Sequence, residues 1–375
     1  MLTYCTNIHP GESWDEVQAG IYSNVPLVSA ALATPATPGP FPLSIWLSGR
    51  AAREIESSGS ARFVEWCRAN HCQIRSINGF PFGAFHGVRV KEQAYLPDWR
   101  DPERLAYTVS LGRILAGWLS GDEPGVISTV PLGFKGAAET PLKADWALAR
   151  THLVSALESF DRVAQQTGRQ LILALEAEPA CILETSTEVI RFFEELRLPR
   201  SLSSHLGICF DCCHQAVEFE RPAESLRLLA DAGVRVAQAH VTAALRVPGG
   251  ELARLERFSE PTYLHQAVGR RTDGTLLRYP DLPLALAAGV DGRDIDEWRV
   301  HFHVPVFART LGDCETTQPE LEQMLGALAS EVPLVVETYS FGVLPPELQA
   351  RTVAESVIRE LSWVRDHRAA HGSVR

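Results

Sequence analysis

Short apolar runs alternate with longer amphipathic stretches along almost the whole chain. The runs are rich in Val, Ile and Leu and lack strict polar alternation, which is typical of parallel strands buried on both faces. Nine runs have this character: residues 2–8, 43–47, 73–77, 126–130, 171–175, 206–210, 234–241, 300–306 and 334–336. The pattern therefore predicts an α/β fold around a parallel sheet.

The stretches between these runs have helical spacing and helix-start signals. Ser13 and Glu16 stand three residues apart, as do Thr185 and Glu188, and each pair is typical of a capping box. Helical periodicity also marks residues 101–119, 143–167, 222–232 and 346–368. Because strand and helix alternate throughout, we predict a single domain, residues 1–375, with the fold of a (β/α)8 TIM barrel.

A barrel needs eight strands, and the pattern offers nine. The extra candidate lies in residues 243–333, a region too long for one helix that contains the turn signal Pro248-Gly249-Gly250. We interpret this region as an insertion between strand seven and strand eight. Residues 300–306 would then be an added strand or an extended segment near the barrel mouth. The rival fold, an open doubly wound sheet, usually carries a Gly-x-Gly-x-x-Gly fingerprint, which is absent here.

Length and charge narrow the function. A chain of 375 residues, 45% of them hydrophobic, can fold without disulfides or a structural metal, so a metal site would be catalytic. The formal net charge of −11 disfavours nucleic acid as a partner. The sequence has no signal segment and no long apolar run, and its eight cysteines are expected to be reduced thiols. We therefore expect a cytoplasmic protein without membrane insertion.

Four apolar runs end in an acidic or imidazole side chain. These residues are Glu176, Asp211, His240 and Glu337. Barrel active sites lie at the carboxyl ends of the strands, so the four groups are expected to converge. Three carboxylates and one imidazole suit a divalent cation: Mn, Zn, Mg or Co. For each residue taken alone, a salt bridge, a helix cap or a satisfied core imidazole is the alternative.

Other polar residues are expected around the same point. Alternation along a strand would place His301 and His303 on one face, where they would add metal ligands or hydrogen-bond loops. Further pocket candidates are His9, Asn78, His86 and Glu178.

The order Glu, Asp, His, Glu resembles the xylose-isomerase-like barrel superfamily, which includes sugar epimerases and abasic-site endonucleases. Asp211-Cys212-Cys213-His214 resembles its Asp-x-x-His motif, and His240 with Arg246 and Pro248-Gly249 resembles the epimerase pattern His-x5-Arg-x-Pro-Gly. The resemblance implies that His214 and Arg246 hold substrate hydroxyls. It also implies that Glu176 and Glu337 transfer protons, and that the metal ligands are Glu176, Asp211, His240 and Glu337.

A second resemblance covers nearly the whole chain. The chain is similar to the EboE group of bacterial metabolite-traffic proteins in several segments: residues 4–11, 78–83 with His86, 95–99, 127–132 and 301–305. This resemblance implies a context in metabolite traffic but no particular reaction. The interval from His240 to Glu337 is longer than in simple epimerases, and His301 and His303 are additions.

Three functions remain open at this stage. The first is a metal-dependent isomerase or epimerase of a small polyhydroxy or carbonyl metabolite, with proton transfer by two metal-bound glutamates. The second is a zinc-dependent hydrolase, similar to the abasic-site endonucleases but acting on a non-DNA substrate, with the extra histidines binding further metal. The third is a non-catalytic protein that binds a metabolite for traffic. Each takes a small-molecule partner, and each leaves homo-oligomer formation open.

Overall fold

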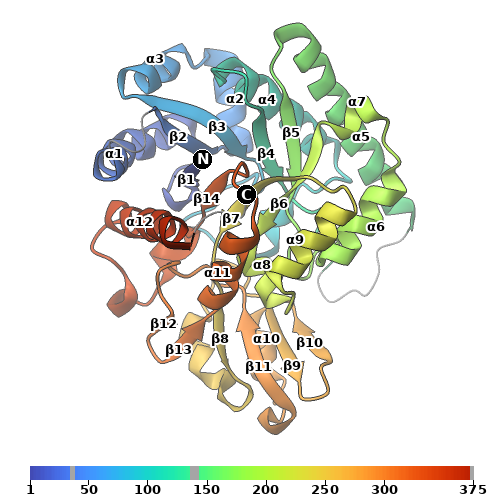
Figure 1. Cartoon of the computed structure of the whole chain (residues 1–375), viewed down its shortest axis with the longest axis vertical. Coiled ribbons are helices and arrows are strands. Elements are labelled where there is room, and N and C mark those ends of the chain that lie inside the picture. Colours follow the sequence, from blue (N-terminus) through green and yellow to red (C-terminus); the bar gives the residue numbers. More distant parts are fainter. Residues whose placement is uncertain (34–38, 136–142, 372–375) are drawn as a thin grey trace.

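The computed structural model describes residues 1–33, 39–135 and 143–371. Eight parallel strands form one sheet in the order β1-β14-β7-β6-β5-β4-β3-β2. Their bounds are β1 (Leu2–Tyr4), β2 (Phe41–Trp46), β3 (Cys72–Asn78), β4 (Gly125–Thr129), β5 (Leu171–Leu175), β6 (Leu206–Asp211), β7 (Val236–Val241) and β14 (Leu334–Val336). A parallel bridge between Cys5 and Ser44 joins the two edges. The predicted TIM barrel is confirmed (Figure 1).

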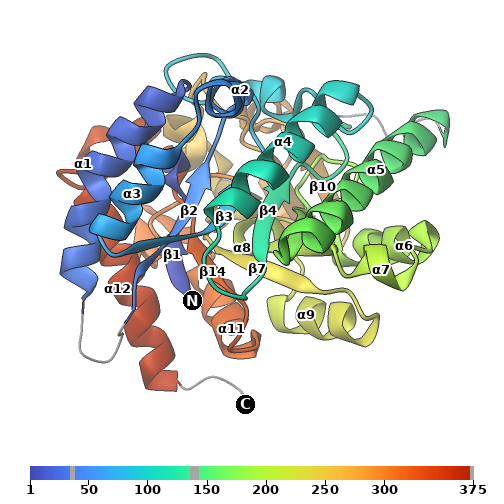
Figure 2. The same cartoon turned by 90° about the horizontal axis from the view of Figure 1, so that it is seen from above.

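Helices surround the strands (Figure 2). They are α1 (Trp14–Leu32), α2 (Gly49–Ser58), α3 (Ala61–Ala69), α4 (Pro102–Trp118), α5 (Lys143–Thr167), α6 (Ser186–Leu196), α7 (Arg200–Ser203), α8 (Cys212–Val217), α9 (Pro222–Asp231), α11 (Gln318–Ala327) and α12 (Val353–His371). Both predicted capping boxes are present, at Ser13 and at Thr185. Among the described residues, no helix combines the length and the apolar character needed to cross a bilayer.

Two predicted boundaries are wrong. The first apolar run was expected to be a strand over residues 2–8, but β1 ends at Tyr4 and Thr6–Ile8 form a 3-10 turn. The last helix was expected to begin at Pro346, but Pro346–Leu348 form a separate 3-10 turn and α12 begins at Val353. The hydroxyl of Thr352 caps the start of this helix by accepting a hydrogen bond from the backbone N–H of Glu355. The Pro-rich segment before Thr352 made this cap difficult to identify from the sequence.

The barrel strands are buried on both faces, as the apolar runs predicted. On β5, Leu171, Leu173 and Leu175 belong to the large core that includes the surrounding helices. Ile172 and Ala174 belong instead to a separate small cluster that also contains residues of β4, β6 and β7. Since side chains alternate along a strand, the position after Ala174 that shares its face is Glu176, at the carboxyl end of the strand.

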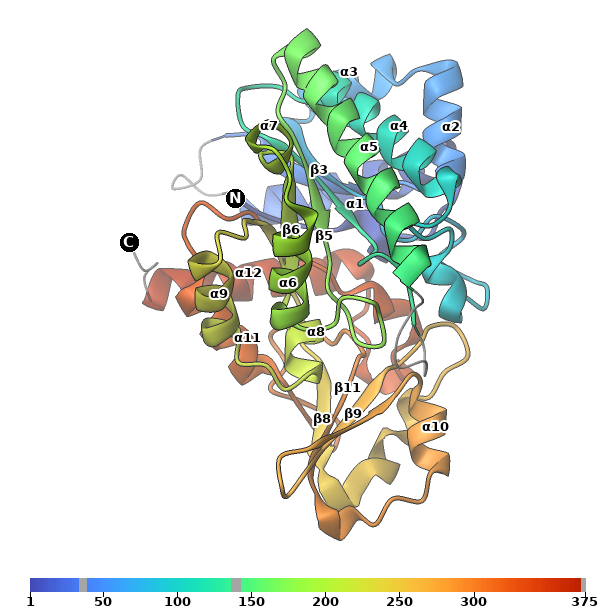
Figure 3. The ribbon, with the colours of Figure 1, turned by 90° about the vertical axis from the view of Figure 1, so that its right-hand side faces the viewer.

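The insertion between β7 and β14 folds into a second sheet. Its strand order is β10-β9-β11-β8-β13-β12, and all pairs are antiparallel. The elements are β8 (Leu245–Pro248), β9 (Ala267–Arg271), β10 (Leu276–Tyr279), α10 (Leu282–Ala287), β11 (Ile295–Val300), β12 (Thr310–Leu311) and β13 (Cys314–Thr316). Figure 3 shows this sheet at one end of the barrel, next to α8, which directly follows β6. The second sheet therefore lies at the carboxyl-terminal mouth.

Residues 300–306 are mostly not a strand. Val300 is the last residue of β11, and the residues after it have no regular secondary structure. Backbone hydrogen bonds from His301 to Gln266 and from Val304 to Ala243 attach this segment to the insertion and to the end of β7. The run was expected to be either an added strand or an extended segment near the mouth, and the second of these predictions is correct.

Candidate metal centre

Four strand ends bring ionisable side chains to one point at the mouth. Ligand atoms of Glu176, Asp211, His240 and Glu337 all lie within 4.8 Å of one another. All four residues are buried, with between 0% and 5% of their surface exposed. They come from the ends of β5, β6, β7 and β14. The convergence expected from sequence is therefore present in the structure.

His240 lies at the centre of this group. Its Nδ1 is 2.8 Å from Oε1 of Glu176, 3.1 Å from Oε2 of Glu337 and 3.6 Å from Oδ2 of Asp211. Its Nε2 is 3.2 Å from Nε2 of Gln238, whose amide oxygen has no hydrogen-bond partner in the part of the chain that the structure describes. Turning the Gln238 amide over would let that oxygen accept a proton from His240 Nε2. The lone pair of Nδ1 would then face the carboxylates, as a metal ligand requires.

The electrostatics of the group fit a cation. Oε2 of Glu176 and Oδ2 of Asp211 are buried and have no hydrogen-bond partner among the described residues. Burial raises the pKa of Glu176 to about 7, although His240 opposes that shift. Burial also acts to raise the pKa values of Asp211 and Glu337, but neighbouring imidazoles, chiefly His214 and His240 respectively, hold both below their ordinary values. A divalent ion would satisfy the orphaned oxygens and offset the buried negative charge.

Metal uptake is expected to weaken as the pH falls. A cation must displace the proton that Glu176 carries below a pKa of about 7. The proton of Glu176 alone should lower the affinity about 30-fold between pH 8 and pH 5.5. The drop should be larger still, because Cys209, Glu176 and Glu337 raise the pKa of His240 against the effect of burial, and its proton must be displaced as well. Titration against a competing chelator at several pH values would measure it. An affinity independent of pH over this range would show that Glu176 is not a ligand.

Gln238→Ala is expected to weaken metal affinity by about 10- to 100-fold, because partners that orient a ligating imidazole typically contribute that much. The Gln238 side chain is buried, and its Nε2 lies 3.2 Å from Nε2 of His240 and 3.5 Å from the sulfur of Cys209. Gln73→Ala, at the opposite end of the barrel on β3, is the control and should leave the affinity unchanged. Equal affinities for both variants would contradict the orientation argument.

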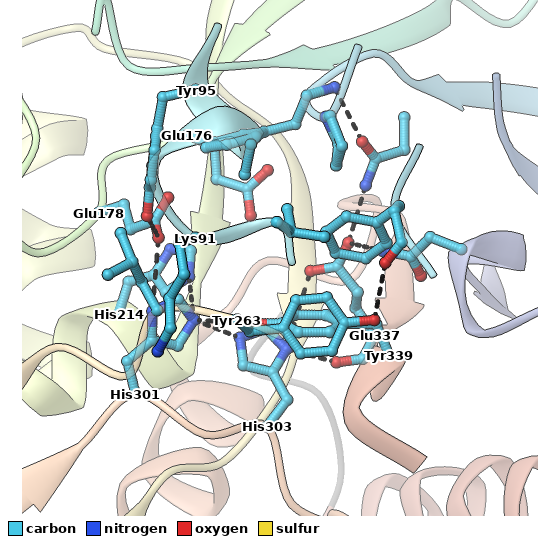
Figure 4. Close-up of a pocket in the computed structure, with 18 residues that line it drawn as sticks. Lys91, Tyr95, Glu176, Glu178, His214, Tyr263, His301, His303, Glu337 and Tyr339 are labelled. Carbon is cyan, nitrogen blue, oxygen red and sulfur yellow. Dashed lines mark hydrogen bonds and ion pairs between the residues drawn. The ribbon is translucent and has the colours of Figure 1, made fainter. Parts of the chain in front are cut away.

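The centre opens into a pocket at the mouth of the barrel (Figure 4). Glu176 and Glu337 line it, together with Asn7 and Asn78. Oε1 of Glu337 accepts hydrogen bonds from Nδ2 of Asn7 at 2.9 Å and from Nδ2 of Asn78 at 2.7 Å. These bonds fix one oxygen of Glu337 and leave the other facing His240.

Of the remaining residues that the sequence predicted for the pocket, some line it and others do not. His214, Asn78, Glu178, His301 and His303 line the pocket. His86 lies just behind the lining, where its Nε2 is 2.6 Å from the backbone oxygen of Asn7. His9 was expected to line the pocket, but it is buried against the Tyr4 hydroxyl, 3.0 Å away.

Arg246 does not reach the pocket. It lies on β8 of the second sheet, where its guanidinium pairs with Glu315 at 2.7 Å and with Glu320 at 3.8 Å. Pairing of β8 with β13 places Arg246 directly opposite Glu315. The role in holding substrate that the epimerase pattern implied is therefore not supported by the position of this residue.

Several pocket residues were missed from sequence: Lys91, Tyr95, Tyr263 and Tyr339. Lys91 Nζ is 2.7 Å from Oδ2 of Asp281, and the Tyr95 hydroxyl donates to Glu178 at 2.6 Å. Burial raises the pKa of Glu178 to about 8, against the hydrogen bond from Tyr95. Only Tyr339 carried a usable signal, because it stands two residues after Glu337.

Comparisons with known proteins agree on the fold. The chain is similar to a D-allulose 3-epimerase from Methylomonas sp. (TM-score 0.54, 11% identity, 98% of this chain and 97% of that one). It is similar to a xylose isomerase-like TIM barrel protein from Mycobacterium smegmatis in complex with magnesium (TM-score 0.53, 9% identity, 99% of this chain and 97% of that one). It is also similar to an IolI protein with a bound zinc atom (TM-score 0.50, 11% identity, 100% of this chain and 99% of that one). No protein-family model and no curated protein matches the sequence.

The fold and the site together define the class. The chain is a TIM barrel whose fold is similar to that of xylose-isomerase-like barrel structures, and its mouth carries a cluster of buried acidic and imidazole groups that could hold a divalent metal.

Proposed function

We propose that the protein is a divalent-metal-dependent isomerase or epimerase that acts on a small polyhydroxy or carbonyl metabolite. The observation that carries this proposal is the buried convergence of Glu176, Asp211, His240 and Glu337 within 4.8 Å, with orphaned carboxylate oxygens in the group. A bound divalent ion would supply Lewis-acid polarisation of a substrate carbonyl.

The two glutamates supply the acid–base chemistry. Glu176 and Glu337 both line the pocket as well as belonging to the metal-ligand group. One removes a proton from the carbon beside the carbonyl, and the other returns a proton to the substrate. Glu337 is held for this task by Asn7 and Asn78.

The pocket lining suits a neutral, hydroxyl-rich substrate. Aromatic rings of Phe85, Tyr263 and Tyr339 provide faces on which a sugar ring packs. Lys91 is the one lysine among the described lining residues, and Asp281 neutralises it. A phosphorylated substrate would find no unpaired ammonium there. Two of the solved structures similar to this chain are sugar 3-epimerases by name, which supports the same substrate class.

The cellular context is a further part of the proposal. The resemblance to the EboE group supports a step in bacterial metabolite traffic. All eight cysteines are buried and free, which supports a reducing compartment such as the cytoplasm. The non-catalytic alternative, a metabolite carrier, would capture the same ligand without turnover.

Solvent exchange tests the proposal. The protein would be loaded with Mn, Mg, Co or Zn and incubated in D₂O with a panel of keto sugars and polyols, and deuterium incorporation would be followed by NMR. We expect incorporation at one carbon of at least one substrate and its loss in Glu176→Gln. The matched control is Glu218→Gln. Glu218 is a buried glutamate at the end of α8 that pairs with Arg278. No exchange with any metal or substrate would overturn the proposal.

A zinc-type hydrolase acting on a non-DNA substrate is the second candidate. The observation that favours it is the presence of His214, His301 and His303 beside the first group of ligands, because metal hydrolases commonly use two ions about 3.5–4 Å apart. Counting the bound ions separates the two candidates, since a single ion per chain would disfavour hydrolysis.

A further inference from the structure

Buried residues enclose the pocket at the barrel mouth. Of the 18 residues that line it, all but Ala94 and Tyr339 are buried. A pocket with a wide entrance would expose more of its lining to solvent. The described residues therefore leave no sugar-sized entrance to Glu176 and Glu337, and part of the wall must move to admit a ligand.

The movable part of this wall is the centre of the loop after β3. We call residues 83–96 the lid segment. The chain is anchored to the surrounding helices on both sides of it. Before the segment, the backbone oxygen of Phe82 accepts a hydrogen bond from the N–H of Gly49 on α2 at 2.8 Å. After it, Arg104 on α4 donates to the backbone oxygen of Pro97 at 2.7 Å. Movement of the loop is therefore confined to the lid segment.

Hydrogen bonds to the insertion hold the lid segment over the pocket. The N–H groups of Val90 and Lys91 donate to the backbone oxygen of Thr262 at 2.8 and 2.9 Å. The hydroxyl of Tyr263 donates to the backbone oxygen of Phe85 at 2.9 Å, and the rings of these two residues lie 5.0 Å apart. The loop after β3 and the insertion thus form two halves of one cover.

Hydrogen bonds from the lid segment to the barrel itself lie near the ends of the segment. Nε2 of His86 is 2.6 Å from the backbone oxygen of Asn7, and the hydroxyl of Tyr95 donates to Glu178 at 2.6 Å. Among the described residues, every hydrogen bond and ion pair that residues 88–94 make outside the lid segment goes to the insertion. The insertion therefore fixes the centre of the segment.

Lys91 makes most of these contacts. Its Nζ is 2.7 Å from Oδ2 of Asp281 and 3.3 Å from the backbone oxygen of Glu260. Only 7% and 16% of the Lys91 and Asp281 side chains are exposed, so removal of one would leave the other as a shielded charge without its partner. The φ angle of Lys91 is +39°, a left-handed value that a lysine rarely adopts. Such strain persists only where surrounding bonds hold it, and it is typical of switch regions.

We propose that the lid segment is a gate over the mouth and that the ion pair of Lys91 with Asp281 is its latch. When the latch parts, the strained backbone of Lys91 relaxes, the hydrogen bonds to Thr262 break and the pocket opens to solvent. Lys91 and Tyr263, one from each half of the cover, both line the pocket (Figure 4), so a ligand that contacts both favours the closed state. The inference goes beyond the proposed reaction and does not depend on it, because a metabolite carrier would need the same entrance.

Amide hydrogen exchange of the whole chain, without metal, tests the latch. The N–H groups of Val90 and Lys91 exchange only when their hydrogen bonds to Thr262 open. In a Lys91→Met variant, the amides at positions 90 and 91 should exchange at least about 10-fold faster than in the wild type, because the closed state leaves Asp281 without its partner charge. The amides of β5, in the barrel core, should keep their rates.

Two further variants show whether the ion pair itself is responsible. Asp281→Asn should accelerate the same two amides, because it leaves the Lys91 ammonium without a partner charge. Its side-chain oxygen can still accept from the two backbone N–H groups that bond to Oδ1 of Asp281. Arg278→Met is the matched control, since it breaks a 2.7 Å ion pair between the insertion and Glu218, and it should leave both amides unchanged. Circular dichroism would show that each variant is folded.

Manganese binding and release give a second reading. Glu176 and Glu337 line the pocket, so an ion that reaches them from it passes the gate. In Lys91→Met, the rate of manganese binding and the rate of its release to a chelator should both rise about 10-fold, while Kd stays within about 2-fold of the wild type. A purely structural role of Lys91 would change Kd instead.

The outcomes separate the gate from the proposed function. Unchanged exchange at positions 90 and 91 in both Lys91→Met and Asp281→Asn would overturn the latch. Faster amide exchange with unchanged manganese rates would overturn the gate, because the lid segment would then open without controlling the pocket. A protein that binds no metal would contradict the proposed metal enzyme, and hydrogen exchange alone would then decide for or against the latch.

Discussion

A Glu337→Gln variant is expected to lose about 10²- to 10⁴-fold in turnover, which is the usual contribution of a positioned general acid or base. The amide oxygen still accepts from Asn7 and Asn78, which donate to Oε1 of Glu337 in the wild type. The group that replaces Oε2, 3.1 Å from His240, no longer takes up a proton. The rate of solvent deuterium exchange on the best substrate of the panel would measure the loss.

Glu184→Gln is the matched control for that experiment. This glutamate is also buried, but it pairs with Lys135 away from the centre, and its variant should keep wild-type turnover. Unchanged turnover in Glu337→Gln would show that Glu337 transfers no proton. Loss of cellular function in a Glu337→Gln protein that still binds metal would in turn argue against a pure carrier.

An Arg104→Met variant is expected to lose about 3 kcal/mol or more of unfolding free energy. Arg104 is fully buried, and its guanidinium donates to the backbone oxygens of Pro97, Gly79 and Phe80. Its removal leaves three carbonyls without that donor, at about 1–3 kcal/mol for each one that water cannot reach. These carbonyls belong to the loop after β3 that forms one wall of the pocket. Urea unfolding followed by circular dichroism would give the free energy.

Arg113→Met on the same helix is the comparison. Arg113 is exposed, and its partner Glu56 lies on α2, so the variant should change stability by less than about 1 kcal/mol. If both variants lost the same small amount, the three hydrogen bonds of Arg104 would not support the loop as described.

The barrel was predictable from sequence because each of its strands is buried on both faces. Such burial selects uninterrupted apolar residues, as in Leu171–Leu175, and this signal is local. The second sheet gave no comparable signal. Its strands are two to six residues long, and β10 (Leu276–Tyr279) has no fully buried position. The pairing of β11 with both β8 and β9 depends on contacts between distant segments.

The same reasoning applies to the site. Glu176, Asp211, His240 and Glu337 could be found because each stands at the end of an apolar run, and barrel topology brings such ends together. The spacing from His240 to Arg246 was misleading, since the chain turns into the second sheet between them.

The missed wall of the pocket comes from contacts between two loops. Backbone N–H groups of Val90 and Lys91 both donate to the carbonyl of Thr262. This contact joins the loop after β3 to the insertion and brings Lys91 and Tyr263 to the pocket. No local sequence pattern in either loop predicts this contact.

Anomalous X-ray diffraction from crystals grown with zinc or manganese would show whether the four side chains at the mouth hold a metal ion. We expect a strong peak within bonding distance of Glu176, Asp211, His240 and Glu337. A saturated crystal with no peak between those four side chains would contradict the proposed metal centre.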